Sequence, residues 1–268
     1  MEYVNKIEDI YELTDNKILG VPELINSKIN FNGKNNIFVF EKNIRLLNSN
    51  IQFIGDNSII YLSNTKHGTY TFNIIVRNDS AIFIGKNIDF SNSNLNIQEH
   101  QNLIIGDECV IGNRVTMRTC DTHPIYDFKS KRRINFSESI FIGDHVWIDH
   151  SAFISPGTKI GSGSVIGINS FIPKYTTIKS NCYAHGNPIE ILNENIFFTH
   201  EFTGYCTMED TFNHQKYEGD IIYYEYDENE TLSLKNVDKI IKNLPVNERL
   251  EFIYKLLVKN KSKNRFYI

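Results

Sequence analysis

The sequence lacks several features that define common classes of protein. It has 4 cysteines among 268 residues, none of them in a C-x-x-C pair, and 1 tryptophan. Cysteines this sparse favour a reducing compartment over a disulfide scaffold. No stretch reaches the roughly 20 apolar residues of a membrane span, and the N-terminal segment has no apolar core of a secretion signal. We therefore expect a cytoplasmic protein, with the inner face of the membrane as the alternative location.

An excess of positive charge is also missing. Lys and Arg total 28 and Asp and Glu total 32, which gives a formal net charge of -4. This balance argues against nucleic acid as a partner. Hydrophobic residues make up 41% of the chain and aromatic residues 12%, as expected for a packed core rather than a disordered chain. Asparagine is abundant, and because it tolerates left-handed backbone conformations we expect many tight turns.

Isoleucine recurs at every sixth position in the middle of the chain. The series runs from Ile142 to Ile178 without an exception, and turn-forming residues such as Gly143 and Pro173 follow directly after its members. A period of six fits neither an α-helix nor a plain alternating strand. We predict short strands that alternate with corners, so that three repeats close a triangular coil. Stacked isoleucines then fill its interior, each contributing about 1.5–3 kcal/mol when fully buried.

The repeat is interrupted once, between Met117 and Ile142. The intervening sequence is polar and contains Pro124. It carries a cluster of basic residues, Lys129, Lys131, Arg132 and Arg133. Long loops within compact repeat proteins are usually functional. We therefore predict that a loop of about residues 118–141 is ejected from the coil and carries part of a functional site.

The six-residue rhythm divides the chain into three regions. It is present, strongly or weakly, over residues 36–192, which we interpret as the coil domain. Residues 1–35 have no clear repeat and are predicted to be an N-terminal cap of strands or short helices. Residues 193–268 are predicted to be a mixed extension with one or two helices, because the rhythm stops and a helical spacing replaces it.

The helical spacing begins at Ser233. Apolar residues predicted to share one helical face are Leu234, Val237, Ile240 and Ile241. Pro245 interrupts this pattern, and Asn247 is positioned to cap a second helix that continues through Val258. The tail that follows, KNKSKNRFYI, is basic. It fits either a solvated helix end or a contact with an acidic glycan, a capsule-assembly partner or an anionic membrane surface.

Three segments carry a family resemblance. They are CDTHPIYD, the long run GDHVWIDHSAFISPGTKIGSGSVIGINSFIPK, and HGNPIEIL. Together they resemble the hexapeptide-repeat acyltransferase superfamily, nearest to bacterial capsule and polysialic acid O-acetyltransferases and to galactoside and maltose acetyltransferases. The resemblance implies an all-β fold, a left-handed parallel β-helix. It also implies a homotrimer with active sites between subunits, acetyl-CoA as co-substrate, and a sugar or polysaccharide acceptor.

The resemblance assigns catalytic roles to three residues. His123, in the D-x-H-P loop, is the expected general base, because an acceptor hydroxyl attacks a thioester slowly unless its proton is removed. Asp121 is expected to orient that imidazole, with a backbone carbonyl as the alternative. Trp147 stands between two inward-facing residues and should therefore point outward, as a platform for a sugar ring or for the pantetheine arm of the donor. A residue at a subunit interface is the other interpretation of Trp147.

The donor contacts carry over by position. Lys174 matches the family lysine that reaches the coenzyme A phosphates. Ile168 lies at the position beside the pantetheine, and His150 lies at the position beside the thioester. Ile168 and His150 depart from the small residue and the serine that the family usually has there, as Asp149 and Glu190 depart from its usual glycine and lysine. The basic loop residues Lys131, Arg132 and Arg133 are expected to bind a polyanionic acceptor, with a solvated charge cluster as the alternative.

Other functions remain open at this stage. The acceptor can also be a small sugar or a nucleotide sugar, with transfer to oxygen or to nitrogen. A metal enzyme similar to γ-class carbonic anhydrases would use His123, His145 and His150, but their register does not match the three-histidine pattern, so no metal site is predicted. A non-catalytic scaffold is the remaining alternative.

Overall fold

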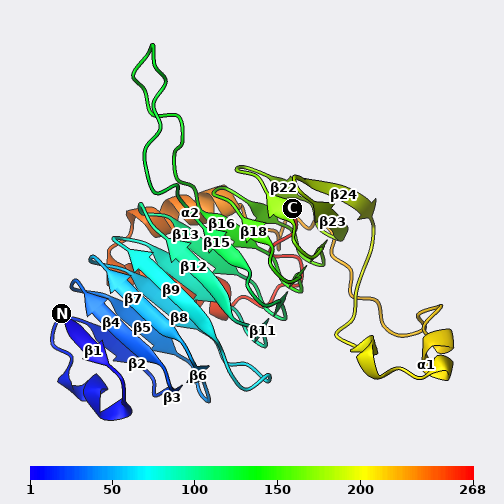
Figure 1. Cartoon of the computed structure of the whole chain (residues 1–268), viewed down its shortest axis with the longest axis horizontal. Helices are drawn as coiled ribbons and strands as arrows, with labels where there is room; N and C mark the ends of the chain where they lie inside the picture. Colours follow the sequence, from blue (N-terminus) through cyan, green and yellow to red (C-terminus); the bar gives the residue numbers. More distant parts are fainter.

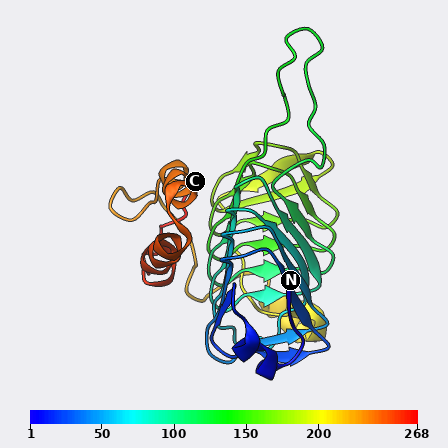
Figure 2. The ribbon, with the colours of Figure 1, turned by 90° about the vertical axis from the view of Figure 1, so that its left-hand side faces the viewer.

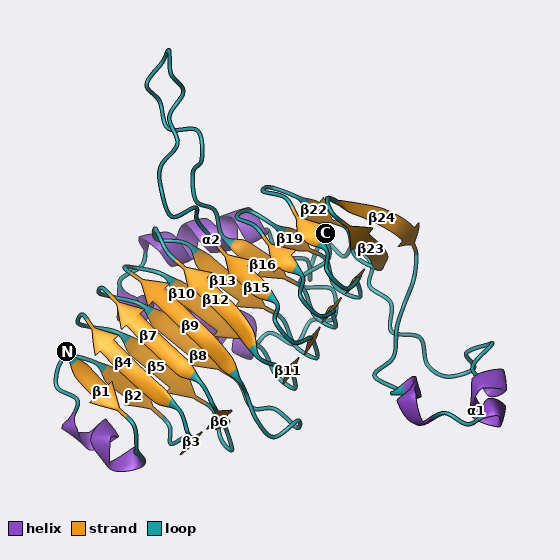
Figure 3. Ribbon diagram, viewed as in Figure 1, coloured by secondary structure: helices purple, strands orange, loops and turns teal.

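Three β-sheets form the walls of a solenoid in the computed structural model, which describes residues 1–268 (Figures 1 and 3). Sheet 1 contains β1 (Glu2–Val4), β4 (Lys28–Asn32), β7 (Asn50–Ile54), β9 (Phe72–Arg77), β12 (Ser93–Ile97), β15 (Thr116–Arg118), β18 (Phe153–Ile154) and β21 (Phe171–Ile172). Sheet 2 contains β2 (Lys17–Leu19), β5 (Ile37–Phe40), β8 (Ile59–Leu62), β10 (Ala81–Ile84), β13 (Asn102–Ile105), β16 (Ile140–Ile142), β19 (Lys159–Ile160) and β22 (Thr177–Ile178). Sheet 3 contains β11 (Asp89–Phe90), β14 (Val110–Ile111), β17 (Trp147–Ile148), β20 (Val165–Ile166), β23 (Cys182–Gly186) and β24 (Ile189–Glu194). β3 (Glu23–Ile25) and β6 (Arg45–Leu47) form the third side of the first coils.

The chain visits the sheets in the order 1, 2, 3 and then begins the next coil. All pairs are parallel except those made by β1 and β24 at the two ends. The predicted parallel β-helix is therefore confirmed. Coil length changes along the chain: Phe153 pairs with Phe171, 18 residues later, whereas Lys28 pairs with Asn50, 22 residues later. The longer coils have strands of up to 6 residues and the shorter ones strands of 2 residues.

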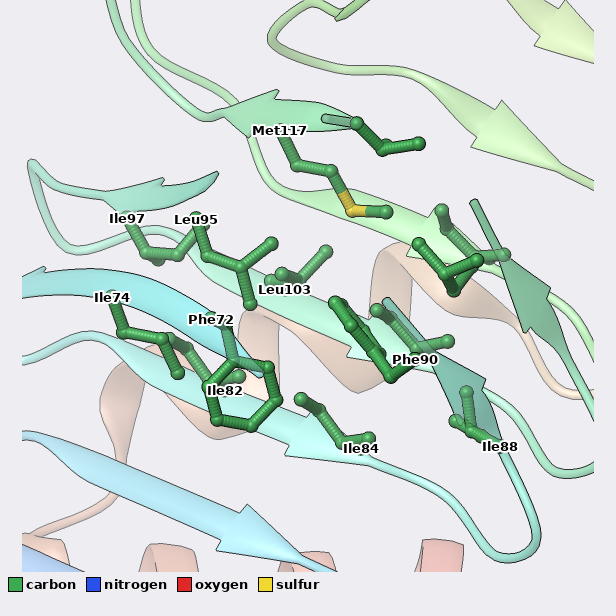
Figure 4. Packing of buried hydrophobic residues seen from close by; sticks show 14 of the residues in the cluster. Phe72, Ile74, Ile82, Ile84, Ile88, Phe90, Leu95, Ile97, Leu103 and Met117 are labelled. Carbon is green, nitrogen blue, oxygen red and sulfur yellow. The ribbon is translucent and has the colours of Figure 1, made fainter. Parts of the chain in front are cut away.

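Apolar side chains from all three walls meet inside the coil. Each isoleucine of the six-residue series is at most 1% exposed. Figure 4 shows the same stacking in earlier coils, where Phe72, Ile82 and Phe90 point into a common interior. Burial of such a ladder is the main source of stability in a repeat whose single coils cannot bury their own apolar faces.

Left-handed residues form corners at a period of six. Positive φ occurs at His145, Ser151, Gly157, Gly163, Asn169, Tyr175 and Asn181. Upstream, asparagine takes this conformation repeatedly, as at Asn35 and Asn57, whose side chains hydrogen-bond at 2.8 Å from one coil to the next. The abundance of asparagine is thus explained by corners that require a conformation few other side chains adopt readily.

The coil begins earlier than the expected boundary at residue 36. β2, β3 and β4 already pair in parallel with the following coil. What caps them is β1 together with the 3-10 helix η1 (Ile7–Glu12). The six-residue pattern is absent from residues 1–35 because paired residues there are 20 or 22 positions apart and not 18.

The C-terminal helices cover the outer face of sheet 2. They are α2 (Leu234–Asn243), α3 (Val246–Ile253) and the π-helical turn η3 (Tyr254–Val258), and they lie alongside the solenoid in Figure 2. Their apolar residues join a second cluster with outward-facing residues of sheet 2, including Tyr61, Phe83 and Phe141. Both predicted helices are confirmed, although Ile240 is 42% exposed and the second helix begins after Pro245, not Asn247.

The basic tail folds back onto the solenoid. The Arg265 guanidinium is buried and contacts both carboxylate oxygens of Asp144 at 2.8 and 2.6 Å. Lys261 pairs with Asp107 at 3.3 Å. Arg265 and Lys261 therefore pair with carboxylates of the same chain, so these two charges of the tail do not serve the expected contact with a membrane or a glycan. No helix combines the length and the apolar character that crossing a bilayer requires.

Candidate active site

The predicted ejected loop is a hairpin that leaves the solenoid between β15 and β16, at the corner of sheets 1 and 2 (Figure 1). Backbone hydrogen bonds join its two arms, from Ile134 to Ile125 and from Asp127 to Arg132, each at 2.9 Å. The Asp127 carboxylate accepts the Ser130 N–H at 2.7 Å and so closes the tip. Large apolar side chains that the hairpin leaves exposed are Ile125, Tyr126, Phe128, Ile134 and Phe136.

Asn135 fixes the segment that bears His123. Its amide nitrogen donates to the His123 carbonyl and to the Asp121 carboxylate, both at 2.9 Å, while its side-chain oxygen accepts the Ile125 N–H at 2.6 Å. The backbone at His123 is therefore held from two sides. The His123 side chain itself is exposed at the base of the hairpin.

The expected contact between Asp121 and the His123 imidazole is not formed. Asp121 instead pairs with Lys174, which lies at the same corner of sheets 1 and 2 further along the solenoid. Partial burial acts to raise the pKa of Asp121, but the Lys174 ammonium and the Asn135 amide hold it below its usual value. The pair joins the base of the hairpin to the coil. Asp121 was expected to orient His123 and Lys174 to reach the coenzyme A phosphates, but in the single chain the two residues bind each other.

The basic residues of the loop divide into two groups. Arg133 makes a bidentate contact with Glu99 at 2.8 Å for both oxygens, and this bond lowers the pKa of Glu99. Arg133 is thereby a structural residue of the hairpin base. Lys131 lies over the Phe128 ring at 4.4 Å near the tip, and both Lys131 and Arg132 are exposed.

Trp147 lies on the outer face of sheet 3, as its position in the repeat predicted. Its strand pairs with β14 on one side and β20 on the other, and the neighbouring Ile148 points into the core with no exposed surface. Trp147 is 37% exposed. Two clefts meet at this residue, because Trp147 and Asp149 line both of them.

The first, which we call the Ile168 cleft, has a volume of about 400 Å³ and includes Gly167, Ile168 and Tyr183. The second, the His150 cleft, has a volume of about 610 Å³ and includes Asp89 and His150. His150 Nδ1 accepts the Asn113 N–H at 3.1 Å, so the neutral ring carries its proton on Nε2. Predicted donor residues His150 and Ile168 therefore flank Trp147 on its two sides.

The predicted site residues fall into two sets that lie on different parts of the coil. His123, Asp121 and Lys174 lie at the corner of sheets 1 and 2. Trp147 lies on sheet 3, and His150 and Ile168 follow at the corner of sheets 3 and 1. In a triangular coil the corner of sheets 1 and 2 faces away from sheet 3. One chain consequently does not bring the two sets together.

The three histidines of the metal alternative are also separated. His145 lies at the corner between β16 and β17, where its ring stacks on Phe198, while His123 and His150 belong to the other two corners. No group of three His, Cys, Asp or Glu side chains is arranged to hold a metal ion.

Known proteins with similar sequences and structures are acetyltransferases. A polysialic acid O-acetyltransferase of Escherichia coli O1:K1 / APEC is 33% identical over 138 residues, covering 52% of this chain and 44% of that protein. A galactoside O-acetyltransferase of Escherichia coli strain K12 is 36% identical over 115 residues, covering 43% of this chain and 55% of that protein. The aligned segments thus span about half the length of these curated relatives.

The solenoid also matches a crystal structure. The polySia-specific acetyltransferase NeuO superposes with a TM-score of 0.63 and 29% identity, covering 75% of this chain and 95% of that chain. No model of a protein family matches the sequence. The chain is similar to sugar O-acetyltransferases. The resemblance to hexapeptide-repeat acetyltransferases is therefore confirmed.

Two features near the acetyltransferase-like motifs were missed by sequence reasoning. Asn135 organises the hairpin base, but one asparagine among many carries no distinctive signal. Residues 196–203 of the extension line both clefts beside Trp147, although this segment lies beyond the last repeat. Only the run of aromatic residues there, IFFTHEF, distinguishes it in the sequence.

Proposed function

We propose that this chain is an O-acetyltransferase that moves an acetyl group from acetyl-CoA to a sugar hydroxyl in a bacterial surface polysaccharide of the capsule or polysialic acid type. The similarity to the polySia-specific enzyme, which extends over 95% of that chain, carries this proposal. The position of the D-x-H-P segment on a projecting hairpin supports it. We propose that the reaction takes place in the bacterial cytoplasm.

His123 is the general base. Its imidazole takes the proton from the acceptor hydroxyl as the hydroxyl oxygen bonds to the thioester carbon, and the carbon–sulfur bond breaks. The same imidazole returns the proton to the departing sulfur, so charge balances over the cycle. A backbone N–H stabilises the negative charge that develops on the carbonyl oxygen. The exposed ring on a fixed backbone suits this role, because it is accessible to a substrate while Asn135 limits its movement.

The active protein is a homotrimer with sites between neighbouring subunits. His123 and Trp147 lie on different parts of one coil, so a second copy must supply one of them. The hairpin is suited to reach a neighbour, because its large apolar side chains are exposed in the single chain. Closed symmetric rings are the usual result when one patch binds a different patch on an identical chain.

The donor lies between copies for the same reason. The Ile168 cleft is open to a pantetheine arm beside Trp147. His150 lies in the adjoining cleft, on the other side of Trp147, where we place the thioester. Lys174 is at the other corner, so the lysine that neutralises a coenzyme A phosphate comes from the neighbouring subunit. On binding, that phosphate competes with Asp121 for the Lys174 ammonium.

A small neutral sugar is the second candidate acceptor. The galactoside O-acetyltransferase of Escherichia coli is 36% identical to the aligned part of this chain. The exposed cations Lys131 and Arg132 favour the polyanionic acceptor, because their charges are not paired within the hairpin.

The test is thiol release from acetyl-CoA, followed with a free-thiol reagent. Polysialic acid, neutral capsule polysaccharides and simple galactosides serve as acceptors, and a reaction without acceptor serves as the control. We expect acceptor-dependent release with one class of glycan and a matching acetyl ester in the product. No release with any acceptor, together with no binding of coenzyme A by calorimetry, would contradict the proposed function.

A further inference from the structure

The C-terminal extension crosses the two clefts beside Trp147. Ile196 and Phe197 line the Ile168 cleft, and residues 198–203 line the His150 cleft. These residues follow β24, the last strand of the solenoid. Part of each cleft is therefore built by a segment that has left the repeat.

A corner of the coil holds this segment in register. The His145 ring stacks on the Phe198 ring with centroids 4.0 Å apart and an angle of 7°. His145 Nε2 lies 3.0 Å from the Phe198 carbonyl, and the Phe198 ring lies 6.1 Å from Trp147. His200 packs edge-on against His145 at 4.9 Å. Residues 198–200 are thus held against His145, which lies two positions before Trp147 in the sequence.

The His150 cleft combines aromatic faces with hydrogen-bonding groups. Trp147, Phe198 and Phe202 supply the aromatic faces. Asp89, Asp149 and Glu201 supply carboxylates, and burial lowers the pKa of His200, which keeps that imidazole neutral near pH 7. Glu201 uses one oxygen to bind His214 at 3.0 Å, which leaves the other available. A sugar ring requires this combination, because it has an apolar face and a rim of hydroxyl groups.

We propose that residues 198–203 form the acceptor-binding side of the active site. Phe198 and Phe202 pack against the apolar face of a sugar unit, while His200 and Glu201 hydrogen-bond to its hydroxyl groups. This inference rests on the proposed function and identifies the part of the chain that selects the acceptor. The extension thus adds contacts to one sugar unit of the acceptor, beside the hairpin cations Lys131 and Arg132, while its first residues also line the donor cleft.

Trp147 allows acceptor binding to be measured without turnover. It is the only tryptophan of the chain, so the intrinsic tryptophan fluorescence reports on this cleft alone. The full-length protein is titrated with methyl β-galactoside and with a short sialic acid oligomer, in the absence of acetyl-CoA. We expect one of the two sugars to change the Trp147 emission in a saturable way.

Phe202→Ala is the decisive variant, because Phe202 lines the cleft yet is 71% exposed and supports little of the fold. We expect its Kd for the sugar to rise about five- to tenfold, the usual effect of losing one aromatic contact. Glu201→Gln should raise the Kd by about threefold, because the amide keeps a hydrogen bond to the sugar but loses the negative charge. Phe212→Ala is the matched control: Phe212 is 69% exposed in the same extension but does not line this cleft.

The outcomes separate this inference from the proposed function. Saturable sugar binding that Phe202→Ala weakens, without acetyl transfer, supports the acceptor site and contradicts the transferase. Acetyl transfer with an unchanged acceptor KM in both variants overturns the acceptor site and leaves the transferase. A rise in the KM for acetyl-CoA alone would assign the segment to the donor and overturn the inference. No response of wild-type Trp147 to either sugar would also overturn it.

Discussion

Trp147 and His123 belong to regions that are built in different ways. Trp147 lies on a strand paired in parallel on both sides, above a fully buried isoleucine. His123 lies on a hairpin whose contacts with the coil are near its base, through Asp121 to Lys174 and Arg133 to Glu99. The comparison teaches that Trp147 is held by a continuous parallel ladder, whereas the proposed base His123 depends on a few contacts at the base of a projecting hairpin. Mutations should therefore separate stability from activity.

The largest expected effect is on activity alone. His123→Ala should reduce turnover about 10³-fold, the range of a lost general base. The melting temperature should stay unchanged, because the His123 side chain is exposed. Steady-state thiol release and a thermal melt check both parts, and wild-type turnover in the variant would refute the role of His123.

In the solenoid wall beneath Trp147, a core substitution should lower stability more than activity. Ile148→Ala should lower the free energy of unfolding by about 3 kcal/mol, because a cavity forms beneath Trp147 in a ladder with no spare volume. Ile148→Val is the matched control and should cost about 1 kcal/mol. Urea unfolding measures both values; equal stability of the two variants would show that the wall is less tightly packed than described.

Trp147→Ala should change activity more than stability, since 37% of the side chain is exposed. We expect kcat/KM to fall about 30-fold and the unfolding free energy to change by less than about 1 kcal/mol. Trp147→Phe retains an aromatic face and should recover most of the rate. If kcat/KM is unaffected in Trp147→Ala, Trp147 is an interface residue without a role in binding.

The smallest effect concerns the base of the hairpin. Asn135→Ala removes four hydrogen bonds at the base of the hairpin, three of them to the segment around His123. It should lower kcat about tenfold while the KM for acetyl-CoA stays the same. Amide exchange at Ile125 and Ile134 should accelerate, because their arms lose a common anchor. Wild-type kcat with unchanged exchange would mean that the arm is held by other contacts.

Much of the fold was predictable because its signal is local. The isoleucine series specified the 18-residue coils and the interruption specified the hairpin. The longer coils at the N-terminal end were not predicted. Corner asparagines 22 residues apart, such as Asn35 and Asn57, are their signal in the sequence. Contacts within the site were not predictable in the same way, because they join residues far apart in the sequence. Asp121 and Lys174 are 53 residues apart, and so are His145 and Phe198. Such pairs depend on how coils stack, which a one-dimensional pattern does not contain.

The proposed shared site is tested most directly by mixing two subunits that are each impaired at a different residue. His123→Ala and Trp147→Ala chains are co-expressed with different tags, and assemblies that contain both are isolated. If neighbouring subunits contribute the two residues, one site in each mixed trimer, about one third of its sites, combines an intact His123 with an intact Trp147. We predict that thiol release returns to about that fraction of the wild-type rate. Mixed assemblies no more active than the parent variants would contradict a site shared between copies.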